Sequence, residues 1–343
     1  MAATKSFPSR RGELRSRVRQ ALPFMKTSMT KKHLVVLIAT YRRRNELKRC
    51  LDCLERQTHP PDQVVVLDNA AEADIKTLVE SFGARFHYLP LPVNLGCSAA
   101  LKTGEEYAFK EWGEQLSHFW IMDDDAAPEP HTLEQLLDAD RQTTAAIITP
   151  ICTTPAGELF GLPDAVKPVP RKIRKAFRSS RDVQNYFGVQ LVPIYWCTGV
   201  SCLVKSRAVK ESGLHRDDFW MQGDDLEFSM RICRQYGGVL VPWVVTPHLY
   251  PATGKGSESA HIKACSLLQN TTYLGAHEIR TWRTFYYIFA NLWRFFKELG
   301  VNAHTVRYGL RAMFNGAILA EPAGRDSGAR LRQQLARDFT GIN

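Results

Sequence analysis

Short apolar runs alternate with amphipathic segments through the first part of the chain. The apolar runs are rich in β-branched and aromatic residues, which is typical of strands buried on both faces of a sheet. Between the first two runs, apolar residues recur at i, i+3, i+4 and i+7, the spacing of an amphipathic helix. The pattern predicts strands at 33–39, 63–67, 86–89 and 118–122, and helices over 47–54, over 74–82 and after Gly96. This order predicts a mostly parallel α/β sheet with right-handed crossovers.

The second half of the chain is less regular and becomes helical and aromatic beyond about residue 260. The pattern predicts strands at 146–149, 189–196, 202–204 and 239–245, and helices at 206–211 and 224–235. We therefore divide the chain into a basic arm at 1–32, a catalytic domain at 33–255 with a basic insert at 165–182, and a helical C-terminal region at 256–343.

Polar clusters follow three of the predicted strands. They are Thr40-Tyr41-Arg42, Asp68-Asn69 and Asp123-Asp124-Asp125. Ligands of parallel α/β sheets bind beyond the carboxyl ends of the strands. The three clusters are therefore expected at one edge of the sheet, where they would line a common site.

The aspartate triplet is a candidate metal site. Three adjacent carboxylates repel one another, and a divalent cation removes that cost. Oxygen ligands suit Mg²⁺ or Mn²⁺, which also bridge phosphate oxygens. Residues two apart in an extended segment point the same way, so Asp123 and Asp125 are expected to share one ion while Asp124 faces elsewhere. A second register, in which Asp124 replaces a neighbour, remains open. His248 ends another predicted strand and is a candidate third ligand.

A second acidic cluster begins the helix predicted at 224–235. Acids at a helix start are often only caps, but Asp224, Asp225 and Glu227 are three in four residues beside Trp220. A general base must reach a substrate hydroxyl, and an exposed helix start allows this. We take Asp225 as the base. Glu227 lies four residues before Arg231, which permits an ion pair that orients the site.

Basic residues crowd the arm and the insert, and give the chain a formal net charge of +10. Such stretches are either flexible and solvated, or they contact an anionic leaflet or acceptor. No apolar run approaches the ~20 residues that span a bilayer, and the N-terminus has no secretory signal. We therefore expect a cytoplasmic protein, peripheral on the inner face of the cytoplasmic membrane. The eight scattered cysteines are expected to be reduced and mostly buried.

The C-terminal aromatic residues allow two interpretations. Either their rings pack against the catalytic domain, or they form a surface that lies in a membrane interface near a lipid-linked acceptor. The rings are Phe285, Tyr286, Tyr287, Phe289, Trp293, Phe295 and Phe296, and they would form that second surface together with Trp282, Arg283, Trp293, Arg294 and Lys297.

Taken in order, these motifs resemble family-two glycosyltransferases of the GT-A fold, a Rossmann-like sheet flanked by helices. The resemblance covers roughly Leu34 to Tyr250. It is carried by Ala39-Thr40-Tyr41-Arg42, Val65-Val66-Leu67-Asp68-Asn69, Asn94-Leu95-Gly96, the aspartate triplet, Trp196-Cys197-Thr198-Gly199, residues 223–231 and Pro247-His248. The form Gly223-Asp224-Asp225 looks most like galactofuranosyltransferases of cell-envelope assembly, and rhamnosyltransferases are the alternative.

The resemblance implies a role for each residue. Thr40, Arg42 and Asp68 look like a UDP-type nucleotide pocket, completed by Asn94 and Asp124. Asp123, Asp125 and His248 look like the ligands of Mn²⁺ or Mg²⁺. Asp225 looks like the base of an inverting transfer to a glycan or lipid-linked hydroxyl, with Asp224 and Glu227 as neighbouring catalytic acids. Trp196 and Trp220 look like acceptor-binding aromatics.

Two other classes of protein fit less well. A nucleic-acid-binding protein would suit the charge, but the basic residues form no recognisable reading module, and no nucleic-acid partner is expected. A sugar-phosphate nucleotidyltransferase would have a glycine-rich loop after the first strand, where this chain has Thr40-Tyr41-Arg42-Arg43-Arg44.

Overall fold

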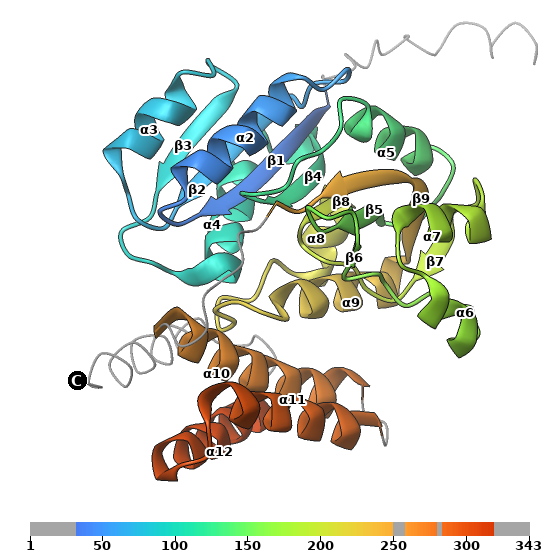
Figure 1. Cartoon of the computed structure of the whole chain (residues 1–343). Coiled ribbons are helices and arrows are strands. Elements are labelled where there is room, and N and C mark those ends of the chain that lie inside the picture. The colour runs from blue at the N-terminus through green and yellow to red at the C-terminus, as the bar shows by residue number, and fades with distance from the viewer. Residues whose placement is uncertain (1–31, 250–257, 280–282, 319–343) are drawn as a thin grey trace, which may run out of the picture. The chain divides into compact units, whose positions relative to one another are not determined.

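The computed structural model describes residues 32–249, 258–279 and 283–318 (Figure 1). Apart from Lys32, the predicted basic arm lies outside the described residues. Within this part of the chain, one sheet has the strand order β3-β2-β1-β4-β8-β5-β9-β7, and β6 pairs with β5. The strands are β1 (His33–Thr40), β2 (Gln63–Asp68), β3 (Phe86–Pro90), β4 (Leu116–Asp123), β5 (Ile147–Thr153), β6 (Leu159–Phe160), β7 (Val192–Ile194), β8 (Ser201–Lys205) and β9 (Gly238–Pro247).

The first four strands run parallel, as the alternation of strands and helices predicts. Thr40 at the end of β1 pairs with Asp68 of β2, and Ala39 pairs with Asp123 of β4. The carboxyl ends of these strands therefore lie together. β8 departs from this pattern, because it runs antiparallel to both β4 and β5, while β5 and β9 are parallel.

Helices cover both faces of the sheet, because alternate side chains of each buried strand point to opposite faces (Figure 1). Val36 and Ile38 of β1 pack with α2, α3 and α5, whereas Val35 and Leu37 pack with α4, α8 and α9. These helices are α2 (Arg44–Glu55), α3 (Ala73–Glu80), α4 (Gly96–Trp112), α5 (Thr132–Asp140), α8 (Ser206–Ser212) and α9 (Asp224–Tyr236), and a short 3₁₀ turn, η1 (Gly113–Gln115), follows α4.

The basic insert is more ordered than the sequence suggests. It contains α6 (Arg171–Ala176) and the first turn of α7 (Ser180–Phe187), and a capping box between Ser179 and Asp182 begins α7. The strand expected at 189–196 is shorter in the structure, where only β7 (Val192–Ile194) forms. α7 extends to Phe187 and ends at Gly188, so the chain leaves the helix just before the expected strand. All eight cysteines are free thiols and six are buried, as expected.

The C-terminal helices have a small core of their own. They are α10 (Glu258–Tyr273), the π-helical turn η2 (Leu274–Ile279), α11 (Arg283–Leu299) and α12 (Ala303–Ile318). Phe295 is buried with Leu268 and Ala312 in this core. Phe289 and Trp293 are 64% and 66% exposed, so the interpretation that the rings pack on the catalytic domain is wrong for these two. No helix within the described residues is both long enough and apolar enough to cross a bilayer.

Candidate active site

Two segments distant in sequence meet at the carboxyl edge of the sheet. One is the turn after β4 with Asp123 and Asp125, and the other is the end of β9 with His248. The backbone joins them, since Ala126 and His248 form an antiparallel bridge and the Leu249 amide donates to the Asp125 carbonyl at 2.8 Å. The Nε2 atom of His248 lies 2.9 Å from Oδ1 of Asp125 and 3.4 Å from Oδ2 of Asp123.

These three side chains can hold one divalent cation. One potential ligand atom from each lies within 4.8 Å of the others. Two carboxylate oxygens and one imidazole nitrogen are a donor set that suits Mn²⁺ or Mg²⁺. The chemistry of the donors therefore fits the cation expected from the sequence.

The site concentrates negative charge in a buried place. Burial raises the pKa of Asp123 to about 6; His248 opposes this shift, and the charges of Asp125 and Asp225 add to it. Burial also acts to raise the pKa of Asp125, but its contacts with His248 and Arg43 lower that pKa overall. The pKa of His248 is raised, because its hydrogen bond to Asp125 and the charge of Asp123 outweigh burial. A bound cation would relieve this repulsion.

Asp124 points away from this triad, as the alternation of side chains predicts. Its carboxylate accepts hydrogen bonds from Thr40 Oγ1 and from Nη1 of Arg43, each at 2.7 Å. Burial raises the pKa of Asp124 to about 7, although Arg43 and Thr40 oppose the shift. In the structure Asp124 therefore joins the loop after β1 to the aspartate triplet.

Arg43, which the motif does not single out, is the arginine that reaches the site. The side chain of Arg42, the expected one, is 68% exposed and lies 3.8 Å from Glu72. Arg43 instead bridges two acids, with Nη1 on Asp124 and Nη2 on Asp125 at 2.5 Å. Because Arg43 contacts Oδ2 of Asp125, the Oδ1 atom of the same carboxylate faces His248. The run of three arginines is the only signal in the sequence for this contact, and it does not indicate which arginine points towards the acids.

We expect Arg43→Met to weaken Mn²⁺ binding about 10- to 100-fold, the usual cost of losing a residue that orients a metal ligand. Arg43→Lys should recover part of the loss, because an ammonium keeps the charge but not the two-pronged contact. Isothermal titration with Mn²⁺ measures both. An affinity that is unchanged or higher in Arg43→Met would contradict the orienting role.

The residues expected at the nucleotide are held by their own loops. Asp68 is fully buried, and its carboxylate accepts hydrogen bonds from two backbone amides and, at 3.0 Å, from the Tyr88 hydroxyl. The side-chain oxygen of Asn94 accepts a hydrogen bond from the Gly96 amide at 3.0 Å. Asp68 therefore holds the turn between β2 and α3, and Asn94 holds the start of α4. Contact with a nucleotide stays a prediction for both.

The second acidic cluster begins α9, and Asp225 faces the loop after β7. Its Oδ2 atom accepts a hydrogen bond from the Gly199 amide at 3.3 Å, and its Oδ1 accepts one from the Leu226 amide at 2.8 Å. Burial raises the pKa of Asp225. Burial raises the pKa of Asp224 to about 7, and the charge of Asp225 adds to this shift. A carboxylate with a raised pKa is a better proton acceptor than one at its ordinary value.

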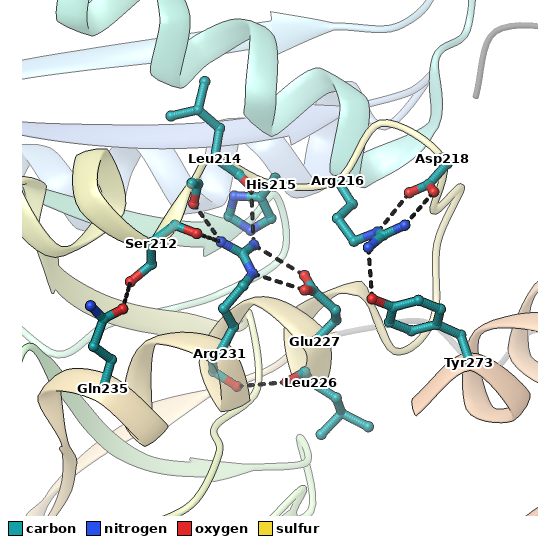
Figure 2. Close-up of polar contacts among 12 residues, drawn as sticks. Ser212, Leu214, His215, Arg216, Asp218, Leu226, Glu227, Arg231, Gln235 and Tyr273 are labelled. Atoms are coloured by element: carbon teal, nitrogen blue, oxygen red, sulfur yellow. Dashed lines mark hydrogen bonds and ion pairs between the residues drawn. The ribbon is translucent and has the colours of Figure 1, made fainter. Parts of the chain in front are cut away.

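The Glu227 carboxylate faces the guanidinium of Arg231, one turn further along α9 (Figure 2). This carboxylate pairs with Arg231 through two contacts, at 2.8 and 3.1 Å, as the four-residue spacing predicts. Arg231 also donates to the carbonyl of Ser212, the last residue of α8, and to those of Gly213 and Leu214 in the loop that follows. The Glu227 carboxylate therefore helps to hold this loop through Arg231, and a catalytic role for Glu227 stays a prediction.

The two tryptophans expected at the acceptor are each tied to a loop. Nε1 of Trp196 donates to Asp164 at 3.3 Å, and the Trp220 carbonyl accepts a hydrogen bond from the Cys97 amide at 2.8 Å. A Cβ atom on Gly96, which has φ +79°, would lie 2.4 Å from the Trp220 carbonyl oxygen. Only glycine therefore allows α4 to begin against the Trp220 loop.

Comparison with known proteins agrees with this geometry. Residues 35–195 match the sequence profile described as glycosyl transferase family 2. The chain carries a family 2 glycosyltransferase domain. Galactofuranosyltransferase GlfT1 of Mycobacterium tuberculosis (strain H37Rv) is 25% identical over 205 residues, which cover 58% of this chain and 64% of that protein. The match thus spans just under two thirds of the relative's length.

Solved structures confirm the predicted GT-A fold. Mannosyltransferase PcManGT from Pyrobaculum calidifontis, in complex with GDP-Man and Mn²⁺, matches with a TM-score of 0.52 and 19% identity, over 91% of this chain and 81% of that one. GalNAc-T7 with UDP, GalNAc and Mn²⁺ matches with a TM-score of 0.50 and 12% identity, over 73% and 52%. At these identities the likeness concerns the fold.

Proposed function

We propose that this protein is an inverting, metal-dependent glycosyltransferase that uses a UDP-type sugar donor. The observation that carries the proposal is the meeting of Asp123, Asp125 and His248 at the edge of the sheet, with Asp225 near enough for its charge to raise the pKa of Asp123. The two solved relatives bind a nucleotide or nucleotide sugar together with Mn²⁺, which supports the same donor class for this fold.

The proposed residues act on two different groups, the departing diphosphate and the acceptor hydroxyl. Asp123, Asp125 and His248 would hold the cation, which when bound neutralises the departing diphosphate as a Lewis acid. Asp225 would take the proton from the acceptor hydroxyl as that oxygen bonds to the anomeric carbon and the carbon–diphosphate bond breaks. No covalent intermediate on the protein is needed. Trp196 and Trp220 would flank the acceptor, and Thr40, Arg42, Asp68 and Asn94 would line the nucleotide.

A panel of nucleotide sugars with Mn²⁺ tests the proposal. The similarity to a galactofuranosyltransferase favours UDP-galactofuranose over a nucleoside-diphosphate rhamnose as donor. The acceptor that we propose from the sequence motifs is a cell-envelope glycan or a lipid-linked hydroxyl. We expect Mn²⁺-dependent binding and slow hydrolysis of one donor, and transfer once an acceptor is added. Binding of none of the donors in the presence of Mn²⁺ or Mg²⁺ would overturn the proposal.

The pKa of Asp123, one of the proposed ligands, predicts how Mn²⁺ protection depends on pH. This pKa rises to about 6, above the ordinary value of roughly 3.9. A raised acid pKa favours the folded state at low pH, and this stability is lost as pH rises through about 6. The metal binds deprotonated ligands. In thermal unfolding, Mn²⁺ should therefore raise the melting temperature more at about pH 7.5 than at about pH 5.5, and an equal rise at both would contradict this prediction.

We further propose peripheral contact with an anionic membrane through α11 and α12. Phe289 and Trp293 are exposed one helical turn apart on α11, and Lys297 lies over the Trp293 ring at 5.1 Å. Leu310 and Phe314 are exposed with the same spacing on α12. Exposed rings flanked by cations are typical of helices that lie in a lipid interface. Trp282 lies outside the described residues, as does the side chain of Arg283. Co-sedimentation with anionic but not neutral vesicles is expected, and equal failure with both would refute the contact.

A further inference from the structure

The turn that begins α9 has an unfavourable backbone. Gln222 has φ +68° and Gly223 has φ +85°, so two consecutive residues are left-handed. Glycine adopts this conformation freely, but a residue with a Cβ atom such as Gln222 does not. Such a conformation persists only where the surroundings hold it, and it is common at functional sites. Asp224 and Asp225 follow the turn directly, so its conformation sets where their carboxylates lie.

A side chain from α10 holds this turn. The amide nitrogen of Asn270 donates to the carbonyls of Met221 and Gln222, at 3.1 and 2.9 Å. Asn270 is fully buried. A Cβ atom placed on Gly223 would lie 3.6 Å from the Cβ of Asn270 and 3.8 Å from a methyl group of Leu274, so the helix packs directly on the turn. Both amide protons of Asn270 therefore donate to backbone carbonyls of this strained turn.

A second contact ties the same loop to the same helix (Figure 2). Arg216 pairs with Asp218 through two hydrogen bonds, at 2.9 and 2.6 Å, and donates to the Tyr273 hydroxyl at 2.8 Å. Its guanidinium also lies 4.4 Å from the centre of the Tyr273 ring. Asn270 and Tyr273 are three residues apart and share one face of the helix. The loop from Arg216 to Gly223, which includes Trp220, is therefore held at both ends.

We infer that α10 is part of the catalytic unit and that Asn270 is a positioning residue for Asp225. This inference rests on the proposed function, because it takes Asp225 as the base. α10 lies well beyond residues 35–195, the segment that matches the family profile, so that segment alone would lack the clamp. The Asn270 amide holds the 221–223 turn, the turn fixes the first residues of α9, and the helix start places the Asp225 carboxylate.

The test compares Asn270→Leu with Thr271→Val in the full chain. Leucine keeps the branched shape of asparagine, although it is larger, but cannot donate. Thr271 is also buried, but its hydroxyl donates to the Leu267 carbonyl within α10 and does not touch the turn, so its loss is a matched control. We expect Asn270→Leu to lower kcat for transfer about 10- to 100-fold, since a misplacement near 1 Å can cost about 10²-fold. Affinity for Mn²⁺ and donor should stay at the wild-type value. Thr271→Val should change neither.

Amide hydrogen exchange tests the clamp independently of any sugar transfer. Exchange in residues 218–226 should become faster in Asn270→Leu and stay unchanged in Thr271→Val. If Asn270→Leu does not fold, Tyr273→Phe removes only the hydroxyl that accepts from Arg216, and the same increase is expected, smaller in size. Unchanged exchange in this segment, or loss of Mn²⁺ binding in step with kcat, would overturn the inference. If the wild-type protein transfers no sugar, but exchange in residues 218–226 is still faster in Asn270→Leu, the proposed function is refuted and the role of Asn270 in holding the turn is supported.

Discussion

Asp225→Asn is expected to retain the donor and Mn²⁺ and to lose transfer by about 10²- to 10⁴-fold, the usual contribution of a general base. The change is nearly isosteric, and the amide oxygen can still accept the shorter hydrogen bond, from the Leu226 amide, while the 3.3 Å bond from the Gly199 amide to the other oxygen is lost. The start of α9 should therefore keep its conformation. What disappears is the carboxylate whose raised pKa suits it to take a proton. Transfer kinetics and donor titration separate the two effects.

Asp217→Asn is the matched control for this variant. Asp217 lies on the loop before α9 and pairs with Lys102 at 2.9 Å, so the same chemical change is made near the site but outside it. Its transfer rate should stay close to that of the wild type, because a partly exposed ion pair away from the reacting groups contributes little. If Asp225→Asn lost donor binding together with transfer, Asp225 would belong to the donor site and another residue would be the base.

Asp125→Ala is expected to lose both Mn²⁺ binding and transfer. Asp125 contacts His248 and Arg43 at once, so its removal takes away a metal ligand and leaves two cationic partners without their shared acid. The loss should exceed the 10- to 100-fold that removing an outer residue costs. Mn²⁺ titration and transfer assays measure it. High Mn²⁺ should not restore the wild-type rate.

Asp140→Ala controls for the loss of a half-buried acid. Asp140 on α5 pairs with His118 and Lys205, at 3.3 and 3.1 Å, away from the site. Its removal is expected to lower stability but not Mn²⁺ affinity. Full Mn²⁺ binding and transfer in Asp125→Ala would show that the cation, if one is used, binds elsewhere.

The sequence predicts the parallel half of the fold because local signals and burial agree there. The run from His33 to Thr40 is buried on both faces, and α2 buries the four residues that the helical spacing selects. The antiparallel direction of β8 could not be predicted in this way, because a buried strand has the same pattern of apolar residues in either direction. α5 also escaped notice, although Leu133 and Leu136 show its buried face.

The sequence predicts the metal-binding triad, but it does not predict the residues that hold the site in place. Asp123 and Asp125 share a direction by strand alternation, and the sheet rule places them at the same edge as other strand ends. Arg43 and Asn270 act over long sequence distances, on Asp125 and on the turn before Asp224. Nothing in the local pattern distinguishes Arg43 from Arg42, or Asn270 from other polar residues of a helix. Such contacts depend on how the helices pack.

An electron paramagnetic resonance titration with Mn²⁺ tests the central claim most directly. The signal of free Mn²⁺ should fall as one ion binds each wild-type chain in the presence of UDP, and this binding should be lost or strongly weakened in His248→Ala. Wild-type affinity in His248→Ala would contradict the account, because the imidazole and the two carboxylates would then not share an ion.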